Sequence, residues 1–381
     1  MSRLMFWVVV AGLIACRDAP AQGPAQRSPR PQAINGALKV ETVATGLVHP
    51  WALEFLPDGR MIVTERPGRL RIISRDGTLS SPLEGVPSVA ARGQGGLLDV
   101  ALDPSFATNR TIYLSYSEPG TGGEAGTSVA RARLTDSRLE NVTVIYRQEP
   151  KVSSSAHFGS RIVFRRDGTM LITQGDRANF RDRAQELSSG IGKIVRIKTD
   201  GSIPSDNPFV GRGNARSEIW SYGHRNIQAA ALHPETGELW TVEHGARGGD
   251  ELNNPRAGRN YGWPVITYGR DYSGSSIGEG TEKAGMEQPV YYWDPVIAPS
   301  GMTFYTGNAF PNWKGSILVG GMAPGRLVRL VITNNRVTTE QQYLAELGER
   351  IRDVRQGPDG LIYVVTDSQR GKVLRLSPAT R

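Results

Sequence analysis

The sequence contains a single cysteine, Cys16, in 381 residues. A single cysteine can form no internal disulfide, so the fold must be held together by its buried core alone. The sequence also lacks HExxH, paired CxxC and Walker A motifs, and it has no GxGxxG that opens a helix. Zinc proteolysis, dithiol redox chemistry and P-loop or dinucleotide binding are therefore not supported. Residues 274–278 match the letters of GxSxG, but they lack a flanking strand and helix, so we interpret them as a loop.

Long apolar runs are also scarce, and the clearest one lies at the start of the chain. Arg3 precedes an apolar run over residues 4–15, which has the length and order of a bacterial export signal and is too short to span a bilayer. We therefore predict that residues 1–16 are an export signal. Cys16 ends the letters LIAC, which resemble a lipoprotein signal site whose cysteine becomes lipidated. Ordinary cleavage near Ala21 is the alternative.

The rest of the chain divides into a short leader and one large domain. Residues 17–37 are rich in Pro, Ala and Gln, which predicts a flexible tether, and residues 38–381 are predicted to form one globular domain. We expect a periplasmic protein that contacts the membrane only through a lipid on Cys16. The formal net charge is +8, but the arginines are spread without a basic run. This pattern disfavours nucleic acid as a partner and favours a small anionic ligand.

Short repeats of a tight turn followed by a β-rich run recur along the globular part. The turn is usually Pro-x-Gly or Asp-Gly, and strands that begin with a glycine and a basic residue alternate with these runs. Asp-Gly hairpins without amphipathic helices between them exclude a doubly wound α/β fold. Repeated small antiparallel sheets predict an all-β fold, a six-bladed β-propeller of four-stranded antiparallel blades. An immunoglobulin-type tandem is the alternative, although linkers are lacking. The repeats lie at residues 56–65, 164–176, 232–245 and 357–367, with a longer turn at 102–116.

Among the five histidines, His157 is the candidate general base. It follows a Ser-rich loop and directly precedes a predicted strand, and a histidine can accept a proton at neutral pH. Asp176 ends the same hairpin, where an aspartate could orient the histidine or simply form a turn. His49 and His233 lie in turns, and we interpret them as packing or turn residues.

Two further segments concentrate groups that bind anions. The letters SYGHRNIQ crowd Arg225, Asn226 and Gln228 into one loop, where arginine offers a planar fork for carboxylates and the amides offer directional hydrogen bonds. In RIRDV, Arg350 and Arg352 lie on one face of a strand, because side chains alternate with period two. The pair could clamp a dicarboxylate or form a solvated edge.

The segment 243–264 is predicted to be too irregular for a helix or a strand. Asp250 and Glu251 are adjacent in it, and its glycines and asparagines bring further oxygen atoms close together. Carboxylates and backbone carbonyls are the ligands of Ca²⁺, so the segment could form a calcium cage. Loops of this composition are otherwise plain turns.

From about residue 43 to residue 376 the chain resembles the soluble aldose sugar dehydrogenases, relatives of soluble quinoprotein glucose dehydrogenase. The family consists of six-bladed propellers that use pyrroloquinoline quinone (PQQ) and calcium. The resemblance therefore implies the same fold, cofactor and metal. The segments that carry it are HPWALEFLPDG, GQGGLLDVALDP, HFGSRIVF with QGDR, SYGHRNIQ, EHGARGGDELN with NYGWP, and RIRDV.

The resemblance also implies roles for single residues. His157 would remove the proton of the sugar's anomeric hydroxyl, with Asp176 as the acid beside it and Arg225 at the quinone oxygens. Gly245 and Ala246 would bind, through their backbone oxygens, the calcium that touches the cofactor. The implied cofactor contacts are Gln94, Asn226, Gln228, His244, Arg350 and Arg352, and the implied ligands of a second, structural calcium are Glu251 and the Tyr261 backbone.

Two positions depart from the family pattern. Ala323 stands where glucose dehydrogenases of this type carry a lysine near the cofactor, and His244 stands where they carry a glutamine. The missing cation would weaken one contact to a cofactor carboxylate without removing the site.

The implied activity is the oxidation of aldoses at the anomeric carbon to lactones, with hydride passing to the quinone. The electrons would then pass to an external acceptor, namely a quinone, a dye or a cytochrome, and the protein would be a monomer or a homodimer. Two other functions stay open at this point. One is a calcium-dependent lactone hydrolase, which needs neither quinone nor arginine clamp. The other is a non-catalytic envelope lipoprotein whose propeller serves as a binding platform.

Overall fold

The computed structural model of the protein describes residues 24–29, 32–34 and 38–379. The predicted signal segment and Cys16 lie outside these residues. Within the described ranges, no helix is long and apolar enough to cross a membrane.

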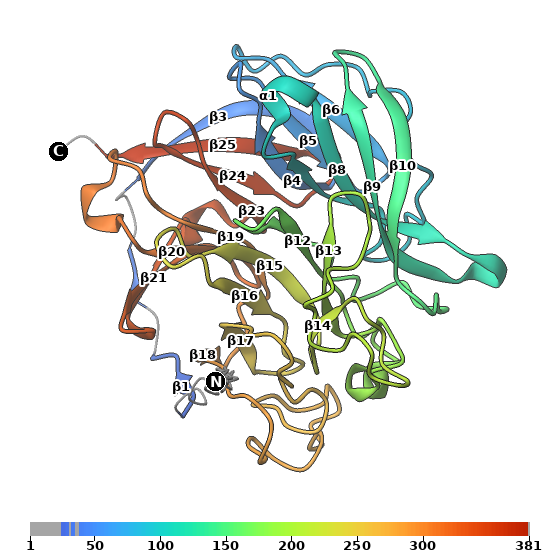
Figure 1. Ribbon diagram of the computed structural model, residues 1–381. Coiled ribbons are helices and arrows are strands. Elements are labelled where there is room, and N and C mark those ends of the chain that lie inside the picture. The colour runs from blue at the N-terminus through green and yellow to red at the C-terminus, as the bar shows by residue number, and fades with distance from the viewer. Residues whose placement is uncertain (1–23, 30–31, 35–37, 380–381) are drawn as a thin grey trace, which may run out of the picture.

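Six antiparallel sheets surround a central axis as the blades of a β-propeller, which confirms the predicted fold class (Figure 1). Blade 1 has three named strands, and a bridge between Ile73 and Leu79 continues its edge. The strands of blades 1 to 3 are β4 (Pro50–Phe55), β5 (Met61–Glu65) and β6 (Arg69–Ile73); β7 (Leu97–Leu102), β8 (Thr111–Pro119), β9 (Ala125–Leu134) and β10 (Leu139–Arg147); and β11 (Ile162–Phe164), β12 (Thr169–Thr173), β13 (Lys193–Lys198) and β14 (Ile219–Tyr222).

Blade 6 closes the ring by joining the two ends of the globular chain. Its outer strand β3 (Leu38–Leu47) pairs antiparallel with β25 (Gly371–Pro378), so the first and last long strands lie side by side. The strands of blades 4 to 6 are β15 (Ile227–Leu232), β16 (Leu239–Glu243), β17 (Asp250–Asn253) and β18 (Tyr291–Trp293); β19 (Pro299–Phe304), β20 (Ile317–Met322), β21 (Gly325–Thr333) and β22 (Arg336–Tyr343); and β23 (Ile351–Gln356), β24 (Ile362–Thr366), β25 and β3.

Two short strands of the leader add to the outer edges of neighbouring blades. Strand β1 (Gln26–Arg27) pairs in parallel with β18 of blade 4, and β2 (Gln32–Ala33) pairs in parallel with β22 of blade 5. Parts of the segment predicted as a tether therefore lie against the propeller.

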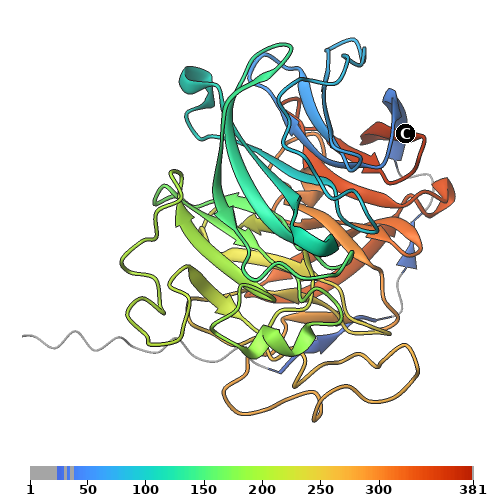
Figure 2. The same ribbon diagram turned by 90° about the vertical axis from the view of Figure 1, so that its right-hand side faces the viewer.

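Helical segments are short and lie in the connections. The one α-helix named in the described chain is α1 (Phe106–Asn109), and the 3₁₀ helices are η1 (Thr121–Gly123), η2 (Arg181–Gln185), η3 (Pro311–Trp313) and η4 (Ala345–Leu347). The longest connection, residues 254–290 between β17 and β18, protrudes at the lower edge of Figure 2.

The repeated Asp-Gly turns fold as their residue types predict. In the first copy, Asp58 Oδ1 accepts a hydrogen bond from the Arg60 backbone N–H at 3.0 Å, and Gly59 takes a positive φ of 85°. Asp167 repeats the contact with the Thr169 N–H at 3.0 Å. Because the aspartate supplies the turn's acceptor and glycine tolerates left-handed φ, each copy reverses the chain between adjacent strands.

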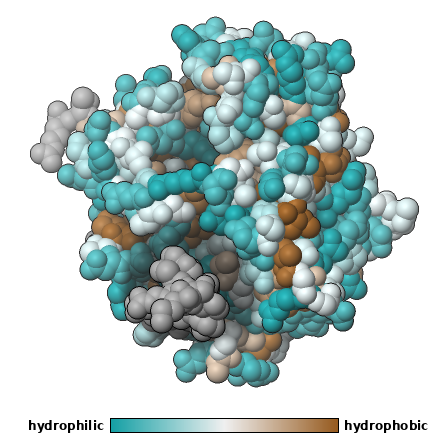
Figure 3. All heavy atoms as spheres, in the orientation of Figure 1, coloured by the Kyte–Doolittle hydropathy of each residue, from teal (hydrophilic) through white to brown (hydrophobic). Residues whose placement is uncertain are grey.

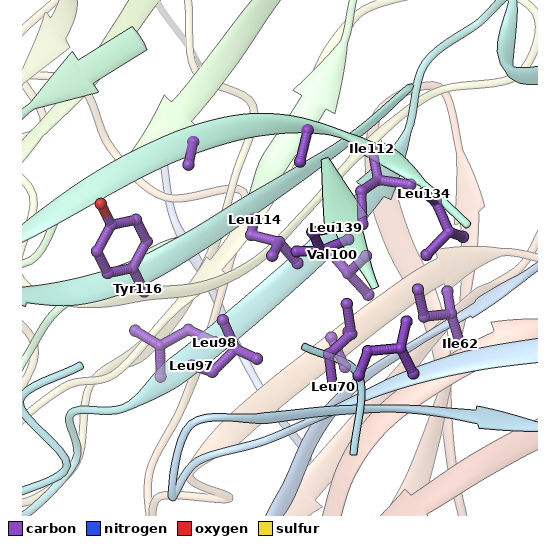
Figure 4. Close-up of a cluster of buried hydrophobic side chains, with 14 of the residues drawn as sticks. Ile62, Leu70, Leu97, Leu98, Val100, Ile112, Leu114, Tyr116, Leu134 and Leu139 are labelled. Carbon is purple, nitrogen blue, oxygen red and sulfur yellow. The ribbon is translucent and has the colours of Figure 1, made fainter. Parts of the chain in front are cut away.

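Apolar side chains fill the spaces between adjacent blades. Figure 4 shows the cluster between blades 1 and 2, in which Ile62 and Leu70 meet Leu98, Val100 and Leu114. These side chains are at most 1% exposed, and burying each leucine or isoleucine contributes about 1.5–3 kcal/mol. Figure 3 shows polar residues over most of the face seen in Figure 1, with apolar residues in small separate groups. Radial packing of this kind leaves the first strand of each blade to line the axis.

Candidate active site

A buried arginine joins five blades at the axis. Arg161, directly before β11 of blade 3, donates to Asp99 of blade 2 at 3.0 Å and to Asp353 of blade 6 at 2.9 Å. Its Nε donates to the Gln228 carbonyl of blade 4 at 2.8 Å, and its guanidinium lies 4.1 Å from the ring centroid of Trp51 in blade 1. The sequence prediction missed this residue, whose only signal is a charge at the start of an apolar strand. Arg161 fixes the axial ends of the strands that carry the site.

His157 and Asp176 form a close polar pair near the axis. His157 Nδ1 lies 2.6 Å from Asp176 Oδ1, and the two side chains are 12% and 1% exposed. Gly175 brings the two loops together, because a Cβ at this position would lie 2.0 Å from the His157 carbonyl oxygen. Since Nδ1 is engaged by the carboxylate, Nε2 is the nitrogen left to accept a proton. The aspartate would stabilise the resulting imidazolium.

Two further contacts hold this pair in place. Trp263 Nε1 donates to Asp176 Oδ2 at 2.8 Å, so both carboxylate oxygens are engaged. Gln94 Oε1 accepts from the His157 backbone N–H at 2.9 Å. The sequence placed Gln94 among the cofactor contacts, and the structure brings it to the His157 loop. The tryptophan was not predicted as a site residue.

Arg177 anchors the loop that precedes His157. Its side chain is fully buried and donates to the carbonyls of Ser154 and Ala156, at 2.6 and 2.5 Å. Its guanidinium lies 3.4 Å from the ring centroid of Phe158. Burial without a direct carboxylate partner lowers the pKa of Arg177 to about 9. The cation therefore serves to fix the backbone on both sides of residue 155.

A cavity of about 170 Å³ lies beside this pair at the axis. Five of the predicted cofactor contacts line it, from blades 4 and 6 and from the connection between blades 1 and 2. They are Gln94, Gln228, His244, Arg350 and Arg352. Residues that the sequence prediction did not assign complete the wall, including Trp51, Arg66, Phe158, Met322 and Asp367.

Asp367 organises the arginines of this cavity. Its Oδ2 accepts from Arg352 at 2.6 Å and its Oδ1 faces His49 Nδ1 at 2.9 Å. Burial opposes the charge of Asp367, but Arg352 and His49 outweigh it and lower the pKa of the carboxyl well below its usual range. His49, interpreted from sequence as a packing residue, thus contacts the site. The two predicted arginines differ, since Arg352 is buried and the Arg350 side chain is 52% exposed.

Several buried donors near the axis have no protein partner among the described residues. Asn226 Oδ1 accepts from the Gly159 N–H at 3.2 Å and from Gln228 Nε2 at 3.2 Å, whereas Asn226 Nδ2 donates to no group. The unpartnered atoms near the axis are Nδ2 of Asn226 and Nε of Arg66, Arg225 and Arg352. Buried donors without partners are costly, so these atoms suit a ligand rich in oxygen.

Arg225 contacts one of the two carbonyls that the resemblance assigned to calcium, that of Gly245. Its guanidinium donates to the His244 carbonyl at 3.1 Å and to the Gly245 carbonyl, and it lies 5.1 Å from the ring centroid of Trp263. Ala246 follows in the same loop and is buried. Asp250 holds this loop, because its Oδ1 accepts from the Gly245 N–H at 2.8 Å. Two carbonyls thus converge on one cationic group.

Asp250 is a positioning residue rather than a solvent-facing ligand. Its Oδ2 accepts from the backbone N–H groups of Ile297 and Ala298, both at 2.8 Å, so it joins blades 4 and 5. Burial nevertheless raises its pKa to about 6. The prediction that segment 243–264 contains no strand is wrong for residues 250–253, which form β17. Pairing on both sides, with β16 and β18, overrides the Gly/Asn-rich composition.

Glu251 and Tyr261 lie in a second polar region next to Glu243. Glu251 and Glu243 are opposite residues of adjacent strands, and Asn253 Nδ2 donates to both carboxylates, at 3.1 and 2.9 Å. Burial and the facing Glu243 raise the pKa of Glu251. Like charges opposite each other are unfavourable, so this pair needs a proton or a cation. The Tyr261 ring stacks on His224 at 4.8 Å.

Glu243 also belongs to an arrangement that resembles a hydrolytic triad. Ser221 Oγ lies 2.9 Å from His224 Nε2, and His224 Nδ1 lies 3.1 Å from Glu243 Oε1. This is the connectivity of a Ser–His–acid triad. Ser221 and His224 are 0% exposed, so no substrate can reach the hydroxyl. The arrangement is therefore structural. It holds Glu243 in place, and Glu243 Oε2 accepts a hydrogen bond from the Arg225 backbone N–H at 2.7 Å.

No group of three or more His, Cys, Asp or Glu side chains suited to a metal occurs in the part of the chain that the structure describes. Any cation here would depend on backbone carbonyls and few carboxylates. Ala323 follows Met322, which lines the cavity, and its own N–H donates to the Ile297 carbonyl at 3.0 Å.

Comparison with known proteins identifies the family. The family model described as Glucose / Sorbosone dehydrogenase matches residues 47–375. The chain belongs to this family. The family is one of oxidoreductases of the sugar dehydrogenase class, in line with the resemblance given by the sequence motifs.

Relatives support the assignment over nearly the full length. The chain is 48% identical to the aldose sugar dehydrogenase YliI of Escherichia coli (strain K12) over 346 residues, which cover 90% of this chain and 93% of YliI. The apo-form crystal structure of the soluble aldose sugar dehydrogenase from Escherichia coli superposes with a TM-score of 0.88 at 47% identity, covering 90% of this chain and 100% of that one. The PQQ-bound aldose sugar dehydrogenase from Streptomyces coelicolor gives a TM-score of 0.72 at 27% identity, covering 89% and 98%.

Proposed function

We propose that this family member is a PQQ- and calcium-dependent dehydrogenase that oxidises aldoses at the anomeric carbon to lactones. The observation that carries the proposal is the His157–Asp176 pair beside a cavity lined by arginines. A base, a carboxylate that stabilises its protonated form, and a clamp for anions are the parts that such chemistry needs from the protein.

The residues present fit a quinone that carries three carboxylates. One cavity is lined by Arg66, Arg350 and Arg352, and the carboxylate in its wall, Asp367, is already paired with Arg352. Unpartnered donors of Asn226 and Arg225 lie nearby. Arg350 and Arg352 would hold carboxylates through charge-assisted hydrogen bonds. Bound PQQ would supply the acceptor for the hydride of the anomeric carbon. The PQQ-bound relative from Streptomyces coelicolor supports this choice of cofactor.

The chain's own contribution is proton transfer and positioning. His157 Nε2 would take the proton of the anomeric hydroxyl, and Asp176 would stabilise the imidazolium through Nδ1–H. Trp263 keeps the carboxylate oriented, and Gln94 keeps the histidine backbone in place. As the hydride leaves the anomeric carbon, loss of the hydroxyl proton lets the C–O single bond become the C=O bond of the lactone.

Calcium is proposed at two places. The carbonyl oxygens of Gly245 and Ala246 are hard donors, and the Gly245 carbonyl already accepts from the Arg225 guanidinium, so an ion there would require Arg225 to release it. Such an ion would polarise the cofactor as a Lewis acid. The second ion would sit at Glu251 and the Tyr261 backbone, where it would offset the repulsion between Glu251 and Glu243.

Dye-linked oxidation of an aldose panel by the purified apo-protein tests the proposal. Activity that appears only with both PQQ and Ca²⁺ would support the cofactor, the metal and the reaction class together. Lactone hydrolysis without quinone would favour the hydrolase, for which the buried Ser221 gives no support. A protein that binds no PQQ and oxidises no sugar would leave the binding platform as the better account.

We also propose export to the periplasm and lipid anchoring through Cys16, on the sequence pattern of residues 1–16. Mass spectrometry of the mature N-terminus tests this. A diacylglyceryl-modified cysteine is expected, and a soluble chain that begins after Ala21 would contradict it.

A further inference from the structure

A second cavity adjoins the cofactor cavity on the side of blade 6. It measures about 500 Å³ and shares Arg350 and Asp367 with the cofactor cavity. We call it the outer cavity. Its other lining residues are Gly348, Glu349, Ser368, Arg370 and Lys372.

Positive charge is in excess in the outer cavity because both of its carboxylates are engaged. Asp367 is held by Arg352 at 2.6 Å and by His49 at 2.9 Å. Glu349 accepts a hydrogen bond from Lys372 Nζ at 2.5 Å. These pairs leave the guanidinium groups of the remaining arginines as the uncompensated charges.

Arg370 is presented to the outer cavity on a rigid turn. It is exposed, and its side chain has no ion-pair partner among the residues described. Its backbone N–H donates to Ser368 Oγ at 3.1 Å. The following Gly371 packs against Pro50 so closely that a Cβ would lie 2.4 Å from the proline ring. The position of the arginine is therefore fixed while its guanidinium stays free.

Arg350 lies at the junction of the two cavities and is only loosely held. Its side chain is 52% exposed, and its nearest oxygen partners are the Met322 carbonyl at 3.4 Å and Asp367 Oδ2 at 3.7 Å. Both contacts are long for a charged donor. The guanidinium can thus face either cavity at little cost.

We propose that the outer cavity is a capture subsite for a small polyanion, which Arg370 and Arg350 hold next to the cofactor cavity. The inference rests on the proposed function, because that function supplies two candidate polyanions. One is PQQ on its way into the cofactor cavity, and the other is an anionic electron acceptor that approaches the bound cofactor. Concentrated positive charge at a cleft raises the association rate of either.

The first arm of the test measures PQQ binding to the apo-protein by stopped-flow absorbance in the presence of Ca²⁺. Arg370→Glu should lower the association rate constant about 3- to 10-fold at low salt, with less effect at high salt. The matched control is Arg336→Glu, which makes the same change of charge at an exposed residue of β22 outside both cavities. The control should change the rate less than about twofold.

The second arm uses the PQQ-loaded enzyme with two acceptors of opposite charge. Arg370→Glu should raise KM for ferricyanide several-fold, whereas KM for the cationic phenazine methosulfate should not rise. A change in the PQQ rate alone identifies the cofactor as the occupant, and a change in ferricyanide KM alone identifies the acceptor.

Two results would overturn the inference. If Arg370→Glu and Arg336→Glu behave alike in both arms, the outer cavity captures no anion, although the proposed function stands. If the wild-type protein shows no saturable PQQ binding, the proposed function and the inference fail together.

Discussion

Arg161 Nη2 lies 2.9 Å from Asp353 Oδ1 and thereby joins blades 3 and 6, which face each other across the axis. Both side chains are at most 4% exposed. Asp99 is the other carboxylate that pairs with Arg161, and its burial away from water raises its pKa. The ion pairs at the axis therefore link blades that share no hydrogen-bonded strand.

Removing Arg161 should destabilise the whole ring. Arg161→Ala removes one of the arginines that pair with the buried carboxylates of Asp99 and Asp353 and leaves them with Arg355, which should lower the free energy of unfolding by about 3–5 kcal/mol. Urea unfolding measures this. Arg133→Ala is the control, because Arg133 pairs with Glu140 at the surface and should cost about 1 kcal/mol or less. Equal losses in the two variants would contradict the role of Arg161 as a link between blades.

His157→Ala should lower kcat about 10²- to 10⁴-fold, because the proton acceptor is lost. Steady-state kinetics with saturating PQQ and Ca²⁺ measure the change. His233→Ala is a suitable control, since His233 packs edge-on against Phe304 at 5.0 Å and is not among the residues that line the cofactor cavity. Near-normal turnover of the His157 variant would refute its assignment as the base.

Arg177→Lys should reduce kcat while leaving KM for the sugar nearly unchanged. Lysine keeps the charge, but it cannot bind the Ser154 and Ala156 carbonyls as a planar fork and stack on Phe158 as well. The loop would then hold His157 less accurately, and small misplacements are costly for catalysis. The pH profile of kcat should shift as well, because the contact between His157 and Asp176 loosens. A variant that loses only thermal stability would assign Arg177 a purely structural role.

The stability of the protein should depend on pH through His244. Burial lowers the pKa of His244 to about 3, and Nε2 is hydrogen-bonded to the Pro299 carbonyl at 2.6 Å. In the unfolded chain a histidine has a pKa near 6.5, so the unfolded state binds more protons between these values. The stabilisation is complete above about pH 6.5 and is lost progressively as the pH falls toward 3.

His244→Gln is the variant that tests this pH dependence. Glutamine can donate to the same carbonyl but does not titrate, so the difference in unfolding free energy between wild type and variant should move in favour of the variant from pH 8 to pH 4.5. Urea denaturation in the presence of a calcium chelator measures it. A difference that does not vary with pH would show that His244 has an ordinary pKa.

The fold could be predicted from sequence because its signals are local. Each Asp-Gly turn contains its own acceptor and its own left-handed glycine, as at Asp58 and Gly59, so the hairpin is readable without tertiary information. Residues 250–253 were missed because their strand depends on partners on both sides rather than on composition.

The candidate site could be predicted only in part, because most of its contacts join segments that are far apart in the sequence. Asp176 and Gln94 were found. Asp176 meets His157 within one hairpin, whereas the contact of Gln94 with His157 depends on how blades 2 and 3 meet. His49 and Asp367 are more than 300 residues apart and meet only because the ring closes. Trp263 and Arg177 carry no motif, since an indole N–H or a buried guanidinium acquires its role from the acceptors that surround it.

The two leader strands, β1 and β2, affect where the N-terminus of a recombinant protein can be placed. Ser28 N–H donates to the Tyr292 carbonyl and Ile34 N–H donates to the Gln342 carbonyl, both at 2.8 Å, so the leader covers part of the free edges of β18 and β22. A recombinant chain that starts at Leu38 would leave those edges open to strands from other molecules. Where the gene is cut would then decide whether the purified protein stays dispersed or self-associates.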